Sequence, residues 1–421
     1  MLFFRRSFQP FFSTMFLGAF NDNMFRNALV VMITYHMAYE QSTATMLSFL
    51  AMALLMLPYF PFSAQAGELA DKIDNAKLFR IVKLIEVVLM SLTAVAFHFK
   101  SVALLLPLLF LMGTQSAFFS PLKYAYIPRN LPPEMLLRGN GYVNAGTYVA
   151  VMLGAVLGNE LISLPHGVSI LSGALVLCSI LGYMAARIIP PQKAVRPDLK
   201  FNFNCFSATW RVVQIIFRDR NLRIATLGLS SFWLVAALYV SQLAPFCHHV
   251  LNAEPRMIPA LYLLFACGVA IGSLLCTQLN RRGNVFKFLP WSLLLMALFT
   301  YDLYLSATVW PTPAAMLPIS DFFSQPKFYR IVIDLLGLAA CGGFYSVPLN
   351  ALLQHSAPAD KVAQVVGGNN IINSGMIAVG TLAVSALMSN GVISLNGVFA
   401  VVGTINLLTG VYLFKLYKTK L

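Results

Sequence analysis

The fold is decided by two stretches of similar sequence, GNGYVNAG at residues 139–146 and GNNIINSG at residues 368–375. Each stretch follows a Pro-Leu pair, Pro121-Leu122 in the first case and Pro348-Leu349 in the second. The same order of features therefore occurs once in each half of the 421-residue chain. Such an internal repeat predicts two related structural halves.

The composition around these stretches is that of a membrane protein. Apolar residues make up 58% of the chain and charged residues 10%, whereas soluble domains carry about 45–50% and about 25%. These proportions exclude an ordinary soluble protein, and they exclude a disordered chain as well. A spanning helix needs about 20 apolar residues, so the chain has room for about twelve spans with their loops.

Long apolar runs recur along the whole chain and predict the spans. They cover residues 11–36, 43–65, 78–99, 101–124, 137–162, 167–189, 224–250, 256–279, 285–306, 328–349, 362–388 and 394–415. We predict an all-α polytopic membrane protein with about twelve transmembrane helices in two pseudo-symmetric six-helix halves, residues 1–189 and 224–421, joined by a cytoplasmic linker at residues 190–223. This layout is that of the major facilitator type of secondary transporter.

The positive charge is distributed unevenly between alternate loops. If both termini are cytoplasmic, most basic loop residues fall on the inner side. They are Arg5, Arg6, Lys72, Lys77, Lys193, Arg196, Lys200, Arg218, Arg220, Arg281, Arg282, Lys361, Lys415, Lys418 and Lys420. Few, such as Lys100, Arg256 and Lys327, fall outside. Because Lys and Arg collect in cytoplasmic loops, the net charge of +14 is explained by topology, and no nucleic-acid partner is expected.

The sequence contains no motif of an enzyme. The six cysteines lie mostly inside apolar runs and lack the spacing of a metal site. A nucleotide-binding Gly-rich loop with Lys and Ser/Thr is absent, and no Ser-His-Asp arrangement is evident. We therefore expect no catalytic residue, no metal and no cofactor.

The linker has an amphipathic pattern of its own. Phe206, Trp210, Val213 and Phe217 recur at helical spacing, and Arg211 and Arg218 lie away from that stripe. The pattern predicts a helix on the cytoplasmic membrane surface. Such a helix is either a passive tether between the halves or a regulatory element.

The first predicted span contains the polar run Asn21-Asp22-Asn23, with Arg26 one turn later. Charge inside a bilayer is costly, so it usually pairs or faces a cavity. Asp22 and Arg26 are four residues apart and share a helix face. They form either a functional face lining a cavity or a purely structural ion pair.

The third and fourth spans also carry charge. Lys83 and Glu86 are three residues apart and can neutralise each other, although Glu86 could instead carry a coupling proton. The fourth span is predicted to end in the segment 120–124, where Pro121 breaks the helical hydrogen-bond ladder. Lys123 could meet a phosphate there, or extend into the headgroup layer. Arg138 is predicted to be an interfacial anchor or an inter-helix partner.

Two further features concern helix packing. Arg330 and Asp334 are four residues apart near the outer end of the tenth span, where a structural or gating pair is expected. Gly154 and Gly158 form a G-x-x-x-G pattern in the fifth span. This pattern favours close packing against another helix, and secondarily a hinge.

The segment GELADK at residues 67–72 resembles the major facilitator loop signature G-x-L-A-D-[RK]. In that superfamily the aspartate helps to lock neighbouring helices at the cytoplasmic face. The resemblance therefore implies a conformational role for a loop containing Gly67, Asp71 and Lys72. The Gly and Arg that usually continue the signature are absent here, where Asp74 and Asn75 stand instead.

A narrower resemblance covers nearly the whole chain. The segments LGAFNDN (17–23), FSPLKY (119–124), PLNALLQH (348–355) and GNN (368–370), with the stretch 139–158, are similar to the bacterial lysophospholipid transporter family. Its members move lysophospholipids to the cytoplasmic leaflet of the inner membrane, where an acyltransferase restores the second chain. Because the chain ends at Leu421, any such acyltransferase is expected to be a separate protein.

The resemblance also implies a headgroup site. The family's aspartate of the first span corresponds to Asp22 and its lysine of the fourth span to Lys123. An ethanolamine ammonium would suit Asp22, and a phosphate would suit Lys123 and Arg26. Asn21, Asn140 and Asn144 complete the expected substrate-binding set.

The expected function is thus inward transport of lysophospholipids by a monomer in the bacterial inner membrane, through alternating access of two halves. One alternative is a proton-coupled carrier of another amphipathic solute, such as a siderophore or drug, with Glu86 or Asp22 carrying the proton. Another is a membrane scaffold or sensor that transports nothing. Charges inside spans of both halves argue against the scaffold.

Overall fold

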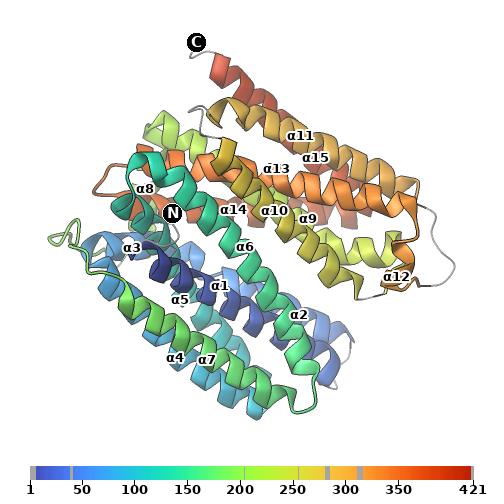
Figure 1. The fold of residues 1–421 in the computed structure, drawn as a ribbon, viewed down its shortest axis with the longest axis horizontal. Helices are drawn as coiled ribbons and strands as arrows, with labels where there is room; N and C mark the ends of the chain where they lie inside the picture. The colour runs from blue at the N-terminus through green and yellow to red at the C-terminus, as the bar shows by residue number, and fades with distance from the viewer. Residues whose placement is uncertain are drawn as a thin grey trace. The chain divides into compact units, whose positions relative to one another are not determined.

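A computed structural model describes residues 6–37, 41–202, 204–254, 256–279, 285–310 and 316–418. These residues are almost entirely helical (Figure 1), and their β-structure is limited to one isolated bridge between Ala253 and Leu317. The basic residues Arg5, Arg281, Arg282 and Lys420, which the topology argument used, lie outside the described residues.

The helices correspond to the twelve predicted spans and two additional elements. In chain order they are α1 (Phe8–Val31) with the π-helix η2 (Met32–His36), α2 (Gln41–Met56), α3 (Tyr59–Lys72), α4 (Asn75–His98), α5 (Val102–Asn130), α6 (Pro133–Ser163), α7 (Gly167–Ile188), α8 (Cys205–Arg218), α9 (Arg220–Pro245) with η3 (Phe246–Val250), α10 (Met257–Leu279), η5 (Val285–Phe288), α11 (Leu289–Thr308), α12 (Ile319–Phe322), α13 (Pro326–Ser356), α14 (Val362–Ser389) and α15 (Leu395–Lys418).

Nine helices among the described residues are long and apolar enough to cross a membrane by themselves. The helix α4 is long enough, but it carries Lys77, Arg80, Lys83 and Glu86. The second predicted span consists of two shorter helices, and α1 contains the polar run at residues 21–23. The predicted class, a polytopic all-α membrane protein, is confirmed.

The predicted boundaries of the second, fourth and tenth spans are wrong. The tenth span was predicted to end at residue 349, whereas α13 continues to Ser356. The second span is not one helix over residues 43–65, because α2 ends at Met56 and α3 begins after Pro58. The helix α3 then continues to Lys72, so the predicted loop at residues 67–72 forms its last turns. Similarly, α5 continues through Pro121 to Asn130. Proline is tolerated in a spanning helix, where neighbouring groups can satisfy the freed carbonyl.

The chain forms two compact units, which are described separately. Unit 1 comprises Met1–Gly139, Val149–Arg223 and Leu352–Ser374, and unit 2 comprises Asn140–Tyr148, Ile224–Ala351 and Gly375–Leu421. Each unit thus contains a short segment from the other half of the sequence. The division into residues 1–189, 190–223 and 224–421 stays a prediction.

In unit 1, α4 packs against α5 and α7, while α1 packs against α7 (Figure 1). Buried side chains such as Phe25, Phe97 and Leu109 form the apolar core between these helices. The helix α6 lies directly on α1, because a Cβ atom at Gly158 would meet the Met24 backbone and one at Gly154 the Phe20 backbone. The predicted close packing of the G-x-x-x-G pattern is confirmed.

Gly154→Ala is expected to destabilise the protein by about 1–3 kcal/mol, because the new methyl group meets backbone that cannot rotate away. Gly173→Ala is the matched control, since a Cβ at that position in α7 meets nothing within 4 Å. Heating the purified proteins in detergent and measuring the fraction that remains monodisperse compares the two. Equal heat resistance of both variants would contradict the contact.

In unit 2, α11 and α15 lie side by side (Figure 1). The helices α10 and α13 also approach closely, because a Cβ at Gly343 would meet the Val269 backbone. The Tyr239 hydroxyl of α9 and the Thr300 hydroxyl of α11 share a buried hydrogen bond. Glycine contacts and buried polar pairs together hold this helix set.

Candidate functional site

A polar cluster lies inside unit 1 where α1, α4 and α5 meet. We call it the intramembrane polar cluster. Its members are Asn21 and Asp22 of α1, Lys83 and Glu86 of α4, and Gln115, Ser116 and Lys123 of α5. Charged groups among spanning helices usually mark either a functional path or a structural ion pair. The cluster contains both an ion pair and charged groups without an ion-pair partner among the described residues.

Within the cluster, Lys83 and Glu86 form a buried ion pair. Lys83 Nζ lies 2.6 Å from Glu86 Oε2, and both side chains are buried. Glu86 also accepts hydrogen bonds from Asn21 Nδ2 at 3.3 Å and Gln115 Nε2 at 3.1 Å. The Lys83 ammonium lies over the Phe119 ring. The predicted neighbour pair is present, and the geometry supports its structural interpretation; a coupling proton on Glu86 stays a prediction.

The Asp22 carboxylate is only half satisfied. Its Oδ2 accepts a hydrogen bond from Ser116 Oγ at 2.5 Å, while its Oδ1 is buried without a hydrogen-bond partner among the described residues. Asp22 is itself partly exposed. Since a carboxylate can accept about four hydrogen bonds, Asp22 retains capacity for a ligand. Arg26, one turn along α1, is also partly exposed, and its expected phosphate contact stays a prediction.

Lys123 is the other charge left available at the cluster. Its Nζ lies 4.6 Å from the centre of the Tyr124 ring, and among the described residues no carboxylate oxygen is close enough to form an ion pair with it. Because α5 continues for almost two turns beyond it, Lys123 is not at a helix end as predicted.

A second cluster joins α3, α5 and the start of α14 within unit 1. Arg129 Nη2 lies 2.5 Å from Asp71 Oδ1, and Gln364 Nε2 donates to Asp71 Oδ2 at 3.1 Å. A Cβ atom at Gly67 would meet the Ala363 carbonyl oxygen at 2.6 Å. The segment 67–72 thus contacts α14 through an aspartate and a glycine, and Lys72 is half-buried beside them. We call these residues the α3–α14 contact.

The repeated Asn-rich stretches form hydrogen bonds at helix contacts. In unit 2, Asn144 Nδ2 donates to Ser346 at 2.8 Å and to Ser273 at 3.1 Å. In unit 1, Asn370 Nδ2 donates to Ser120 at 2.9 Å. Both Asn140 and Asn144 are buried. The Asn144 amide is therefore engaged by serines, and its expected contact with substrate stays a prediction.

A family model described as the Major Facilitator Superfamily matches residues 14–381. The chain belongs to the Major Facilitator Superfamily. It is a multi-pass membrane protein and a secondary transporter, as the repeat and the spans predicted.

Curated relatives agree with the resemblance found in the sequence. The chain is 25% identical over 378 residues to the lysophospholipid transporter LplT of Pectobacterium carotovorum subsp. carotovorum, covering 87% of this chain and 81% of the relative. It is 24% identical over 384 residues to the LplT of Klebsiella pneumoniae, covering 88% and 87%.

Solved structures show the same fold at lower identity. The human organic anion transporter MFSD10 has a TM-score of 0.76 and 12% identity, covering 97% of this chain and 99% of that protein. A bacterial homologue of the iron transporter ferroportin has a TM-score of 0.70 and 13% identity, covering 96% and 98%. These structural similarities support the superfamily fold, and at this identity they do not indicate which substrate this chain transports.

The predicted pair of Arg330 and Asp334 belongs to a larger charge group that includes Asp302. Arg330 Nε donates to Asp302 Oδ2 at 2.8 Å, and its Nη2 donates to Asp302 Oδ1. The direct ion pair therefore joins α13 to α11, and Asp334 of α13 interacts electrostatically with both of its members. Asp334 is buried nearby. Arg138 is exposed near the start of α6, a position that suits an interfacial anchor.

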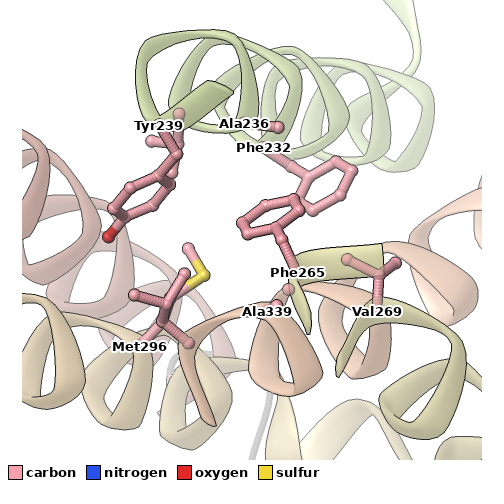
Figure 2. A pocket seen from close by; sticks show the side chains of 10 residues that line it. Phe232, Ala236, Tyr239, Phe265, Val269, Met296 and Ala339 are labelled. Atoms are coloured by element: carbon pink, nitrogen blue, oxygen red, sulfur yellow. The ribbon is translucent and has the colours of Figure 1, made fainter. Parts of the chain in front are cut away.

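An apolar pocket lies in unit 2 between α9, α10, α11 and α13. Figure 2 shows Phe232 and Tyr239, Phe265, and Met296 facing the space between these helices. None of the ten lining residues is charged. The pocket thus offers mainly apolar and aromatic contacts and lacks a charged partner for a phosphate.

Four polar residues of these clusters were not predicted. Gln115 and Ser116 belong to the run Gly113-Thr114-Gln115-Ser116, a polar interruption inside an apolar span that could have been noticed. Arg129 and Gln364 carry no comparable local signal, because their partner Asp71 is far away in sequence.

Proposed function

We propose that the chain moves lysophospholipids from the outer to the cytoplasmic leaflet of the bacterial inner membrane, where a separate acyltransferase re-acylates them. The names of the curated relatives support this substrate. The proposal includes a monomeric protein with both termini in the cytoplasm, as the loop charges favour.

The observation that carries the proposal is the pair of available opposite charges in the intramembrane polar cluster. Within the described ranges, Asp22 keeps one oxygen without a hydrogen-bond partner, and the Lys123 ammonium lies over the Tyr124 ring without an ion-pair partner. Both belong to the intramembrane polar cluster, and no ion pair joins them in the described part of the chain. A zwitterionic phosphoethanolamine headgroup would complement both, since its ammonium suits Asp22 and its phosphate suits Lys123.

Alternating access gives the α3–α14 contact a role in this function. Asp71 of the first sequence half binds the start of α14 from the second half. Inward opening would require that contact to break, since residues 352–374 would leave α3. The two halves, residues 1–189 and 224–421, would then move as bodies around the headgroup.

The function is tested by reconstituting the purified protein in liposomes with labelled lysophosphatidylethanolamine in one leaflet. Protein-dependent transfer to the other leaflet is expected, in excess of that from liposomes containing an unrelated membrane protein. Folded protein without transfer, under an imposed proton or sodium gradient as well, would contradict the proposal. Gradient-driven uptake of another amphipathic solute would then favour the alternative carrier.

A further inference from the structure

The linker helix α8 has two apolar faces, although only one is covered by protein. Ala208, Val212 and Ile216 are buried. On the opposite side, Phe206 is 85% exposed and Trp210 is 65% exposed, and Phe217 is exposed beside them. A helix covered on one face normally presents polar residues on the other. The outer face of α8 is therefore an aromatic patch without a partner among the described residues.

The inner face holds α8 on the α3–α14 contact. The helix packs against α3, and a Cβ atom at Gly368 of α14 would meet Ile216 Cδ1 at 2.8 Å. Glu68 of α3 is fully buried. It accepts the Asn202 backbone N–H at 3.0 Å and lies 3.7 Å from Arg211 Nη1. The position of α8 is thus coupled to both helices whose separation would open the protein inward.

Chain connectivity places the outer face at the bilayer. The helix α8 ends at Arg218 and the candidate spanning helix α9 begins at Arg220. With a single residue between them, the end of α8 must lie where α9 enters the membrane. Exposed Trp and Phe side chains at that level suit the boundary between headgroups and acyl chains.

The charge of the linker favours an anionic surface. Residues 190–223 contain seven Lys or Arg and two Asp, a net charge of +5. Arg211 and Arg218 are seven residues apart and therefore lie on one flank of α8, between its two apolar faces. Clusters of basic residues on an amphipathic helix bind anionic lipid headgroups. A protein partner would need a matching acidic surface, whereas the bilayer is already adjacent.

We propose that the outer face of α8, formed by Phe206, Trp210 and Phe217, binds the anionic lipid surface and thereby sets the transport rate. Lipid-bound α8 stays clamped on α3 and on Gly368. A loss of anionic lipid frees the helix and removes the clamp from the α3–α14 contact. Lipid binding itself is independent of the proposed substrate, while the effect on rate rests on the proposed transport function.

Trp210 supplies a direct measurement of lipid binding. The wild-type protein and Trp210→Phe are reconstituted in vesicles whose lipids carry brominated acyl chains, with or without phosphatidylglycerol. The difference in fluorescence between the two proteins reports Trp210, one of four tryptophans. Strong quenching of this difference signal is expected, and Arg218→Gln should weaken its dependence on phosphatidylglycerol about fivefold. A Trp210 signal quenched by aqueous iodide but not by brominated lipid would overturn the proposal and leave the face for a protein partner.

The effect on rate is measured separately. Substituting serine at Phe206, Trp210 and Phe217 together should abolish the dependence of transport on phosphatidylglycerol, while leucine at the same three positions should preserve it. An unchanged lipid dependence in the serine variant would overturn the clamp. If the wild type transports no lysophospholipid, the proposed function fails, and the quenching experiment still decides whether α8 binds lipid.

Discussion

Asp22→Asn protein is expected to transfer lysophosphatidylethanolamine about ten- to a hundredfold more slowly than the wild type. The reason is the loss of a charge-assisted hydrogen bond to the ammonium group, which is worth about 1.5–3 kcal/mol, and each 1.4 kcal/mol is about a factor of ten. The initial rate of transfer in reconstituted liposomes gives the measurement. The substitution keeps the shape of Asp22 and its contact with Ser116.

Comparing two lysophospholipids distinguishes recognition of the ammonium group by Asp22 from a structural role of Asp22. Lysophosphatidylglycerol has the same phosphate without an ammonium, so Asp22→Asn should slow its transfer much less. Lys123→Met should slow both lipids by similar factors, because the phosphate is common to them. Ser116→Ala is the matched control, since it removes the Asp22 hydrogen-bond donor and leaves the charge. Equal loss of both lipids in Asp22→Asn would instead indicate a structural role for Asp22.

The sequence predicted those features that depend on local spacing. The repeat of residues 139–146 at 368–375 predicted the two-half fold, and the apolar runs predicted the spans. The neighbours Lys83 and Glu86 were predicted to pair because i, i+3 residues share a helix face, and they do. The stripe containing Phe206 and Trp210 predicted the helix α8.

Contacts between distant helices could not be predicted in the same way. Arg330 forms its direct ion pair with Asp302, which is 28 residues away in sequence on α11, although Asp334 is only four residues away on its own helix. Asp22 and Ser116 are 94 residues apart, and Asp71 and Gln364 are 293 apart. No periodicity relates such positions, because the packing of whole helices decides which faces meet. The same packing lets α5 continue through Pro121, which local propensity alone predicts to be a break.

The buried pair of Lys83 and Glu86 makes the largest expected difference in stability. Lys83→Met should destabilise the protein by about 3–5 kcal/mol, because it leaves the Glu86 carboxylate buried without its counter-charge. Glu86→Gln should also destabilise the protein, because it leaves the Lys83 ammonium buried without its counter-charge. Its single amide oxygen can replace only one of the two carboxylate oxygens that accept from Asn21 and Gln115. The fraction of protein that stays monodisperse after heating in detergent measures both.

The double variant Lys83→Met with Glu86→Leu tests whether the ion pair has a role in transport besides its role in stability. Replacing a whole buried ion pair with apolar groups is often neutral in stability, whereas breaking it is not. The double variant should therefore recover most of the heat resistance that Lys83→Met loses. If it also transports lysophospholipid at the wild-type rate, Glu86 carries no coupling proton. Recovered stability without transport would refute a purely structural pair, because folding would then be intact while the carrier cycle is not.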